Sequence, residues 1–356
     1  MLATLLHGPR DVRVEERPDP RLVTGDDAVV RVVAACVCGS DLWRYRGIVD
    51  FEAPKLMGHE FVGVVEQVGD DVHGIRVGDV VIAPFYVCDM TCVHCRGGVS
   101  TSCVRRGGWG FPDDRGVLAD GAQAERVRVP VADSTLVRVP EGVDVDALLP
   151  DLLALSDVCG TGHHAAVSAG VGSGKTVAVV GDGAVGLMAV LAASRLGAER
   201  VIAFSRHPDR QALAREFGAT DILEERGREG AKRVHELTGI GADCVLECVG
   251  TRESIEQAVR SARPGGAVGY VGVPGEGPAW PAQYLFSTNI RVAGGVAPVR
   301  QYLPDLLDDV IAGRIRPGRV FDFETTLDGI AEAYAAMDER RSIKALVRMP
   351  EQPASA

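Results

Sequence analysis

The sequence lacks three features that would direct a protein to a membrane or to nucleic acid. Nowhere do about eighteen apolar residues follow one another without interruption, as a membrane-spanning helix requires. Basic residues are outnumbered, with 38 Lys and Arg against 49 Asp and Glu, so the net charge of -11 gives no general attraction to nucleic acid or to an anionic membrane. The first residues, MLATLLHGPRDV, lack the basic segment and apolar stretch of a secretory signal. We therefore expect a cytoplasmic protein with small-molecule partners, and neither nucleic acid nor a membrane among them.

Internal repeats and low-complexity segments are also lacking, and the length of 356 residues favours about two domains. The first part of the chain, to about residue 140, has short β-branched runs broken by Gly, Pro and Asp, which predict a β-rich, antiparallel sheet. From about residue 158, strand-like segments alternate with amphipathic helical stretches, as in a parallel sheet built of βαβ units. A nucleotide-binding unit is complete near residue 297. The prediction is an α/β protein with domains at 1–157 and 158–297, and with residues 298–356 returning to the first domain.

The individual predicted elements are short. Strands are expected at 28–34, 63–68, 79–83, 126–129, 176–180, 200–204, 244–248, 267–271, 290–294 and 345–348. Helices are expected at 184–196, 209–217, 254–262, 301–311 and 330–338.

Cysteine is plentiful, but its spacing is not the disulfide framework of a small secreted domain. Four of the nine cysteines fall inside sixteen residues, a density typical of a closed tetrahedral zinc site in a reducing compartment. These four are Cys88, Cys92, Cys95 and Cys103. Upstream, Cys38 in C-G-S-D and His59 in G-H-E are ligand types for a zinc that keeps one position open for substrate. Two zinc ions per subunit are therefore expected, one catalytic and one structural.

A glycine pattern predicts a dinucleotide site of Rossmann type. Gly181, Gly183 and Gly186 directly follow the apolar run 177–180 and open a helical pattern, which is the context that this fingerprint requires. The glycines allow a tight turn, close approach of the backbone to a pyrophosphate, and close packing of helix on strand. The same turn includes Ala184 and Val185.

The end of the second strand of this unit indicates which cofactor binds. An NAD-selective site places Asp or Glu there for the ribose 2′-hydroxyl, but this chain has Ser205 and Arg206, with Arg210 nearby. The planar guanidinium of Arg206 suits a 2′-phosphate. We therefore predict NADP(H) in preference to NAD(H), the alternative being that Arg206 is a solvated surface charge.

Taken together, the motifs resemble those of the zinc-containing medium-chain alcohol dehydrogenases over essentially the whole chain. They are C-G-S-D at 38–41, G-H-E at 58–60, the cysteine cluster at 88–103, S-D-V-C-G-T-G at 156–162, G-D-G-A-V-G at 181–186 and R-S-I-K at 341–344. The resemblance implies a GroES-like, β-rich catalytic domain and a Rossmann domain with a doubly wound parallel sheet. It also implies homodimers or homotetramers.

The resemblance further implies that Cys38, His59 and Asp157 bind the catalytic zinc. Many relatives have Cys at the third position, and Asp157 is more similar to the residue in glutathione-independent formaldehyde dehydrogenases. Cys159, two residues further on, is the alternative ligand. By the same resemblance, Glu60 is a transient ligand or lies behind the metal.

Other roles are also implied by the resemblance. Asp41 is expected to accept a hydrogen bond from His59, and Glu60 to pair with Lys344 near the cofactor pyrophosphate. The four clustered cysteines match the family's structural-zinc lobe, although the first gap is three residues where many relatives have two.

The resemblance assigns a proton relay to Ser40, which would hydrogen-bond the substrate oxygen and pass its proton toward solvent through the cofactor ribose. A serine that only caps the following helix is the alternative. Some relatives end the relay with a His near position 43, where this chain has Trp43, which we expect to shape the substrate pocket. The nicotinamide would contact Thr161 and the backbone near Val249, Val271 and Val296.

The sequence as a whole predicts a zinc-dependent oxidoreductase that transfers hydride between an alcohol and an aldehyde or ketone, with NADP(H) preferred. One alternative is a zinc-free quinone or enone reductase of the same fold. Another, from a different class, is a zinc-ribbon nucleic-acid binder. For the substrate pocket, Trp43, the loops near Trp109 and Phe111, and the segment 280–286 suggest apolar or aromatic walls.

Overall fold

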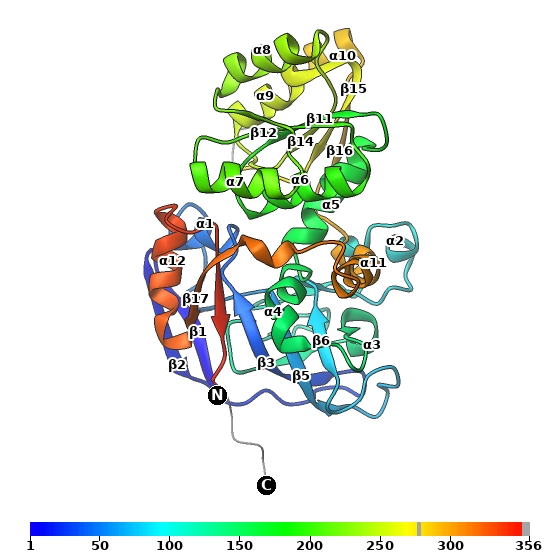
Figure 1. Ribbon diagram of the computed structural model, residues 1–356. Coiled ribbons are helices and arrows are strands. Elements are labelled where there is room, and N and C mark those ends of the chain that lie inside the picture. Colours follow the sequence, from blue (N-terminus) through cyan, green and yellow to red (C-terminus); the bar gives the residue numbers. More distant parts are fainter. Residues whose placement is uncertain (276–278, 351–356) are drawn as a thin grey trace. The chain divides into compact units, whose positions relative to one another are not determined.

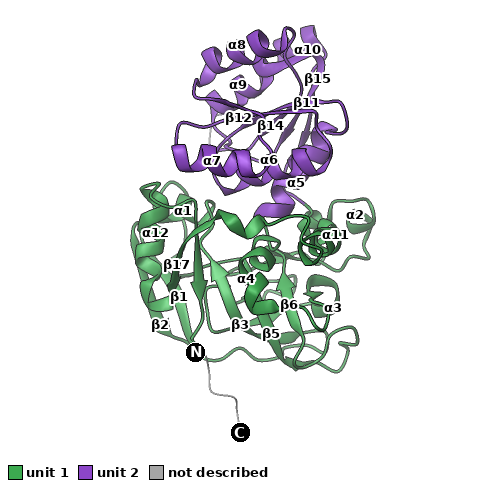
Figure 2. Cartoon of the chain, viewed as in Figure 1, with its two compact units in different colours: residues 1–157, 298–356 green, residues 158–297 purple. Residues whose placement is uncertain are grey.

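The computed structural model describes residues 1–275 and 279–350, which form two compact units (Figures 1 and 2). Unit 1 consists of Met1–Asp157 with Pro298–Ala356, and unit 2 of Val158–Ala297. No helix within the described ranges is long and apolar enough to cross a membrane.

A seven-stranded sheet lies at the centre of unit 1, in the order β10-β6-β5-β3-β18-β17, with β9 also paired to β3. Its strands are β3 (Ala28–Cys36), β5 (Phe61–Val68), β6 (Val80–Ala83), β9 (Arg126–Val129), β10 (Val137–Arg138), β17 (Phe321–Thr326) and β18 (Lys344–Arg348). All neighbours pair antiparallel except β17 and β18. The central strand β3, AVVRVVAAC, is rich in β-branched residues and buries seven of its nine side chains, because such residues pack well on a pleated surface.

Smaller elements complete unit 1. A three-stranded sheet contains β1 (Leu2–Gly8), β2 (Asp11–Glu16) and β4 (Lys55–Leu56), and a two-stranded one contains β7 (Tyr86–Val87) and β8 (Gly107–Gly108). The helices are α1 (Asp41–Tyr45), α2 (Val93–Arg96), α3 (Ala132–Thr135), α4 (Val145–Ala154), α11 (Val299–Ile311) and α12 (Ile330–Asp338), with 3₁₀ turns η1 (Ser100–Ser102), η2 (Pro317–Val320) and η3 (Leu327–Gly329).

The C-terminal segment is an integral part of unit 1. Strand β18 pairs with β3 so that Leu346 lies opposite Cys36. Helix α12 contributes Tyr334, which is fully buried and whose ring centroid lies 5.3 Å from that of Tyr45. This pairing brings residues about 300 positions apart into one core.

Unit 2 is built on a six-stranded parallel sheet in the order β13-β12-β11-β14-β15-β16. The strands are β11 (Thr176–Val180), β12 (Arg200–Phe204), β13 (Asp221–Leu223), β14 (Ala242–Glu247), β15 (Ala262–Tyr270) and β16 (Arg291–Gly294). Written in chain order this is 3-2-1-4-5-6, the strand order of a doubly wound dinucleotide-binding sheet. The predicted fold class is confirmed.

Helices cover both faces of this parallel sheet. They are α5 (Val158–Ala169), α6 (Ala184–Arg195), α7 (Pro208–Glu216), α8 (Gly227–Thr238), α9 (Arg252–Ser261) and α10 (Ala282–Thr288). Figure 1 shows α6 and α7 on one face and α8 and α9 on the other. Helix α9 begins with a reciprocal capping pair, in which the side chains of Thr251 and Ser254 each accept a hydrogen bond from the other's backbone amide. Helix α8 ends at Gly239, whose φ of 80° is accessible to glycine without strain.

The predicted elements agree with the structure where hydrophobic periodicity is strong. Helix α12 has the predicted bounds, and α6 ends one residue before the predicted end. Helices α4, α5, α8 and α10 were not predicted. Helix α5, VCGTGHHAAVSA, includes two glycines and little amphipathic pattern. It forms because it packs against α6, with Gly162 at the contact.

We predict that Gly162→Ala destabilises the protein. A Cβ at this position would lie 2.5 Å from the backbone of Met188 and of Ala189, and backbone atoms cannot move aside cheaply. Overpacking of this kind costs about 1–3 kcal/mol. Alanine gains only about 1 kcal/mol over glycine in helix propensity, so a net loss of stability is expected. The melting temperature should fall by about 2 °C or more. Gly172→Ala is the matched control, because nothing lies within 4 Å of its Cβ, and an equal melting temperature for the two variants would contradict the prediction.

Candidate active site

Four potential metal ligands from three separate stretches converge in unit 1. One ligand atom each from Cys38, His59, Glu60 and Asp157 lies within 4.8 Å of all the others. Cys38 follows β3, His59 and Glu60 precede β5, and Asp157 follows α4. Oδ2 of Asp157 lies 3.7 Å from Sγ of Cys38 and 3.7 Å from Nε2 of His59. Among the described residues the converging group includes Asp157, and it does not include the alternative ligand Cys159.

A chain of polar contacts fixes the orientation of His59. Its Nδ1 lies 3.4 Å from Oδ1 of Asp41, which leaves Nε2 toward Asp157. The other oxygen of Asp41 accepts from the amide of Cys38 at 3.0 Å and from Nε2 of Gln123 at 3.5 Å. The hydroxyl of Tyr334 donates to Oε1 of Gln123 at 3.0 Å. Ligating histidines are commonly oriented in this way by a carboxylate on the second nitrogen. Sequence reasoning missed Gln123 and Tyr334, because no local pattern in the chain places them near Asp41.

The electrostatic environment of this group favours a cation. Burial by itself would lower the pKa of His59, but Asp41, Cys38 and Asp157 raise it well above its usual range. Burial and the nearby Glu60 both raise the pKa of the Cys38 thiol. Both raised pKa values indicate that negative charge is concentrated at this buried site, and a divalent cation would neutralise it. The thiolate, imidazole and carboxylate types fit zinc.

Behind this group, Glu60 and Lys344 form a fully buried ion pair. Nζ of Lys344 lies 2.7 Å from Oε1 of Glu60 and 3.3 Å from the carbonyl of Val37, and both charged side chains are at most 1% exposed. Burial would lower the pKa of Lys344, but Cys36 and Glu60 raise it well above its usual range. Oε2 of Glu60 is buried and has no hydrogen-bond partner among the described residues, so it remains available to a cation at the group.

Ser40 and a cavity lie beside the ligands. Oγ of Ser40 is 3.4 Å from Nε2 of His59. Ser40 stands at the N-cap of α1, and its hydroxyl makes no capping hydrogen bond there. The cavity has a volume of about 220 Å³. Its lining residues are Ser40, Asp41, Arg44, Lys55, Leu56, Met57, Gly58, His59, Phe85, Gly108, Trp109 and Phe111.

The lining differs from the predicted one. Trp109 and Phe111 line this cavity as expected, but Trp43 does not. The prediction that the walls are simply apolar or aromatic is wrong for this part of unit 1, because Arg44 and Lys55 also line it. The sequence pattern missed both cations because Arg44 is in a short helix and Lys55 in a two-residue strand, where isolated charges are normally solvated.

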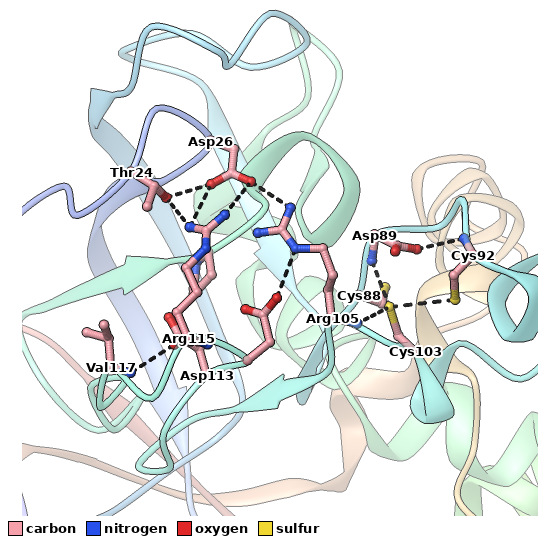
Figure 3. Close-up of polar contacts among 12 residues, drawn as sticks. Thr24, Asp26, Cys88, Asp89, Cys92, Cys103, Arg105, Asp113, Arg115 and Val117 are labelled. Atoms are coloured by element: carbon pink, nitrogen blue, oxygen red, sulfur yellow. Dashed lines mark hydrogen bonds and ion pairs between the residues drawn. The ribbon is translucent and has the colours of Figure 1, made fainter.

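The second candidate metal centre contains a carboxylate. Ligand atoms of Asp89, Cys92, Cys95 and Cys103 all lie within 4.8 Å of one another, so the prediction of Cys88 as the fourth member is wrong. The amide of Asp89 donates to Sγ of Cys103 at 3.2 Å, and Sγ of Cys92 lies 3.9 Å from that of Cys103, as Figure 3 shows. Burial alone would raise the pKa of Asp89, but the backbone amides of Cys92 and Thr91 lower it to about 2, so the carboxylate is ionised at neutral pH.

Cys88 lies outside this group of ligand atoms. It directly follows β7 and is fully buried, and its amide donates to Oγ1 of Thr135 at 3.4 Å. The spacing held a signal for this. Two residues separate Asp89 from Cys92, and two separate Cys92 from Cys95, so counting from Asp89 removes the irregular first gap.

Polar contacts anchor this lobe to the rest of unit 1. The Arg105 amide donates to Sγ of Cys103 at 3.3 Å, while its guanidinium reaches Asp26 at 2.7 Å and Asp114 at 3.1 Å. Figure 3 shows this arginine extending from the cysteine loop to Asp26. On α11, Nε2 of Gln301 donates to the carbonyl of Cys95 at 2.9 Å. These contacts fix the lobe at its middle and at its C-terminal end.

In unit 2, the glycine fingerprint forms the turn between β11 and α6. Gly181 has φ of 122°, where other residues are strained, and Gly183 is the N-cap of α6. A Cβ on Gly186 would lie 2.0 Å from the carbonyl oxygen of Gly181, so only glycine permits this packing. Ala184 and Val185 are the first residues of α6. The arrangement directs the first amides of a helix toward the turn, as anion-binding dinucleotide sites do.

The residues predicted to select the cofactor lie at the end of β12. Oγ of Ser205 donates to Oδ2 of Asp182 at 2.8 Å, and Nη1 of Arg210 lies 3.5 Å from Oδ1 of Asp182. Arg206 is exposed and donates from Nε to the carbonyl of Glu224 at 2.7 Å. Sequence reasoning missed Asp182, although it lies inside the fingerprint itself. Arg210 is paired with Asp182, whereas Arg206, among the described residues, uses only its Nε in a hydrogen bond. The remaining N–H donors of the Arg206 guanidinium are therefore available for a ligand.

The other predicted cofactor residues are distributed over unit 2. Thr161 lies in α5, and Val271 directly follows β15 and is 9% exposed. Val249, 39% exposed, follows β14, where its amide donates to Oε1 of Glu247 at 2.9 Å. Val296 is 66% exposed. The two positions after strands β14 and β15 lie at the carboxyl edge of the parallel sheet, where such sheets bind ligands.

We predict that Lys344→Met strongly destabilises the protein, because Glu60 then becomes a buried charge without compensation. Loss of one partner of a buried pair costs about 3–5 kcal/mol. The double variant with Glu60→Gln should recover much of that loss, since no buried charge remains unpaired. Denaturant unfolding of the two single variants and the double variant gives the coupling energy. The exposed pair Arg228 and Glu256 is the control, with an expected coupling below about 1 kcal/mol, and equal coupling in the two pairs would refute the prediction.

Comparison with known proteins supports the fold and the family resemblance. The family described as "Alcohol dehydrogenase GroES-like domain" matches residues 24–141, and that described as "Zinc-binding dehydrogenase" matches residues 184–311. Zinc-type alcohol dehydrogenase B of Aspergillus flavus is 35% identical over 99% of this chain and 82% of its own length. A probable zinc-binding alcohol dehydrogenase of Mycobacterium tuberculosis is 36% identical, over 96% of this chain and 86% of its own.

Solved structures agree with these matches. The alcohol dehydrogenase from Thermus sp. ATN1 is 33% identical, with a TM-score of 0.89, over 98% of this chain and 100% of that one. The resemblance drawn from the motifs is confirmed over the length of the chain. This chain therefore belongs to the zinc-containing medium-chain alcohol dehydrogenases, a family of oxidoreductases with a GroES-like domain and a Rossmann-type sheet.

Proposed function

We propose that this protein transfers hydride between an alcohol and an aldehyde or ketone, with a catalytic zinc held by Cys38, His59 and Asp157 and with NADP(H) as the preferred cofactor. The observation that carries the proposal is the convergence of these three side chains from distant parts of unit 1 onto one buried, strongly negative place. A zinc-free reductase of this fold would have no use for such a group.

Zinc bound there supplies a Lewis acid that favours the deprotonated form of an alcohol and polarises a carbonyl. A nicotinamide cofactor bound to unit 2 would supply the hydride acceptor for alcohol oxidation, and the hydroxyl proton would need a separate acceptor. Oγ of Ser40, which is close to Nε2 of His59, is placed to accept that hydrogen bond and pass the proton on. Asp41 holds the imidazole of His59 in one orientation, and Glu60 with Lys344 balances the charge behind it.

A second zinc is proposed at Asp89, Cys92, Cys95 and Cys103. Three thiolates and one carboxylate carry the same formal charge as four thiolates, and the carboxylate is already ionised. Because the four side chains come from one loop and leave no open position, this site is structural.

Metal analysis should separate the two sites. We expect about two zinc ions per chain in the unaltered protein and about one after Asp157→Ala, with loss of turnover, since a three-ligand site loses a ligand. Asp89→Ala should also leave about one zinc, whereas Cys88→Ala should retain about two. Elemental analysis by mass spectrometry, on protein handled without chelators, gives the counts. Loss of zinc from Cys88→Ala but not from Asp89→Ala would show that the structural site is assigned wrongly.

The NADP(H) preference rests on Ser205 and Arg206 at the end of β12, where a carboxylate would repel a 2′-phosphate. Arg206 has no ion-pair partner among the described residues and is exposed, so its guanidinium can meet a phosphate in a bidentate way. Arg210 would assist from its position beside Asp182.

We expect Arg206→Ala to lower kcat/KM for NADP(H) about tenfold or more, because a hydrogen bond to a charged group contributes about 1.5–3 kcal/mol. The kcat/KM for NAD(H) should change little. Arg228→Ala, another exposed arginine of unit 2, is the control. Steady-state kinetics with both cofactors decides the matter, and a preference for NAD(H) in the unaltered protein would overturn the assignment.

A further inference from the structure

The cavity beside the candidate metal centre has a cationic wall. Lys55 in β4 and Arg44 in α1 both line it, together with Ser40 and His59. Its volume of about 220 Å³ is below the roughly 300–1,000 Å³ of sites for drug-sized ligands. The part of the substrate that it accepts is therefore small.

The two cations are held around one aromatic ring. Nζ of Lys55 lies 3.6 Å from the ring centroid of Phe111 and donates to the carbonyl of Gly110 at 2.9 Å. The guanidinium carbon of Arg44 lies 5.4 Å from the same centroid. Both contacts are within the range of cation–π attraction. Both like charges are therefore near one ring that also lines the cavity.

Among the described residues, no carboxylate forms an ion pair with either cation. Within residues 1–275 and 279–350, neither Arg44 nor Lys55 has an acidic group within 4.0 Å. Asp41 also lines the cavity, but its oxygens are occupied by His59, the Cys38 amide and Gln123. Burial and the nearby Arg44 lower the pKa of Lys55 to about 8, although Asp41 acts in the opposite direction. Two adjacent, partly desolvated cations without a counter-charge favour an anion.

We propose that the substrate of this enzyme carries an oxyanion, a carboxylate or a phosphate, that binds between Arg44 and Lys55 while its reacting carbon lies at the Ser40 and His59 end of the cavity. The guanidinium offers a planar fork of donors to such a group and the ammonium a point charge. This inference rests on the hydride transfer proposed above. The reaction is then the interconversion of an anionic alcohol and oxidised cofactor with an anionic aldehyde or ketone, reduced cofactor and a proton.

The test compares charged and neutral substrates of matched shape. For the carboxylate arm, 4-carboxybenzaldehyde is compared with its methyl ester, and for the phosphate arm, glyceraldehyde 3-phosphate with glyceraldehyde. We expect the unaltered enzyme to favour at least one charged member by about tenfold or more in kcat/KM, since a charge-assisted contact contributes about 1.5–3 kcal/mol. The arm with the larger ratio identifies the oxyanion.

Substitutions should then remove the preference. Lys55→Met and Arg44→Met are each expected to lower the charged-to-neutral ratio about tenfold, and Lys55→Arg to retain part of it. Lys232→Met, the same loss of charge on the exposed surface of α8, is the matched control and should leave the ratio as it was. A merely structural effect would lower kcat/KM for the charged and the neutral substrate by the same factor and leave their ratio unchanged. Turnover of neutral aldehydes without any preference for charged ones would overturn this inference and leave the proposed function standing.

If no aldehyde reacts, the proposed function is refuted, and a binding measurement then tests the anion site separately. Benzoate and inorganic phosphate are titrated calorimetrically into the zinc-loaded protein. Weaker binding of either anion after Lys55→Met, but not after Lys232→Met, supports the anion site. Equal binding by all three proteins shows that these cations do not receive an oxyanion.

Discussion

The buried negative charge around His59 is the constraint on which the rest of unit 1 depends. Glu60 and Asp157 bring carboxylates within 4.8 Å of a thiol and an imidazole, out of contact with most of the solvent. Like charges at such distances repel strongly unless cations compensate them. Lys344 compensates from one side, at 2.7 Å from Glu60, and the zinc proposed here would do so from the other. The return of the C-terminal segment to β3 is thus part of the site, because it delivers that lysine.

Carboxylates stand at two places where thiolates are common in this family. Asp157 is in the group with Cys38 and His59, and Asp89 is in the group with three cysteines. Each substitution keeps one negative charge while replacing sulfur by a harder oxygen donor. At Asp89 the backbone amides of Thr91 and Cys92 satisfy one carboxylate oxygen, so the loop itself holds the acid in its ionised form.

The cavity adds a second electrostatic feature of opposite sign. His59, one of the proposed metal ligands, lines the cavity, and so do Arg44 and Lys55, which both contact the ring of Phe111. An arrangement of this kind orients a substrate that has an electron-rich reacting oxygen at one end and an anionic group at the other. The size of the cavity then limits the distance between the two ends.

The sequence by itself determined the family, the fold class and most of the strongly periodic elements, such as α12 and the strand-turn-helix around Gly181, because local spacing and hydrophobic period carry that information. It did not reveal α5, whose glycines suit close packing on α6 and not helix propensity. The regular spacing from Asp89 favours it over Cys88 as a ligand, but only the structure shows that the ligand atom of Asp89 converges with those of Cys92, Cys95 and Cys103. Gln123, Tyr334, Arg44 and Lys55 gain their roles only from neighbours far away in the chain. Tertiary structure alone decided those contacts, because burial and charge depend on distances in space and not on separation in sequence.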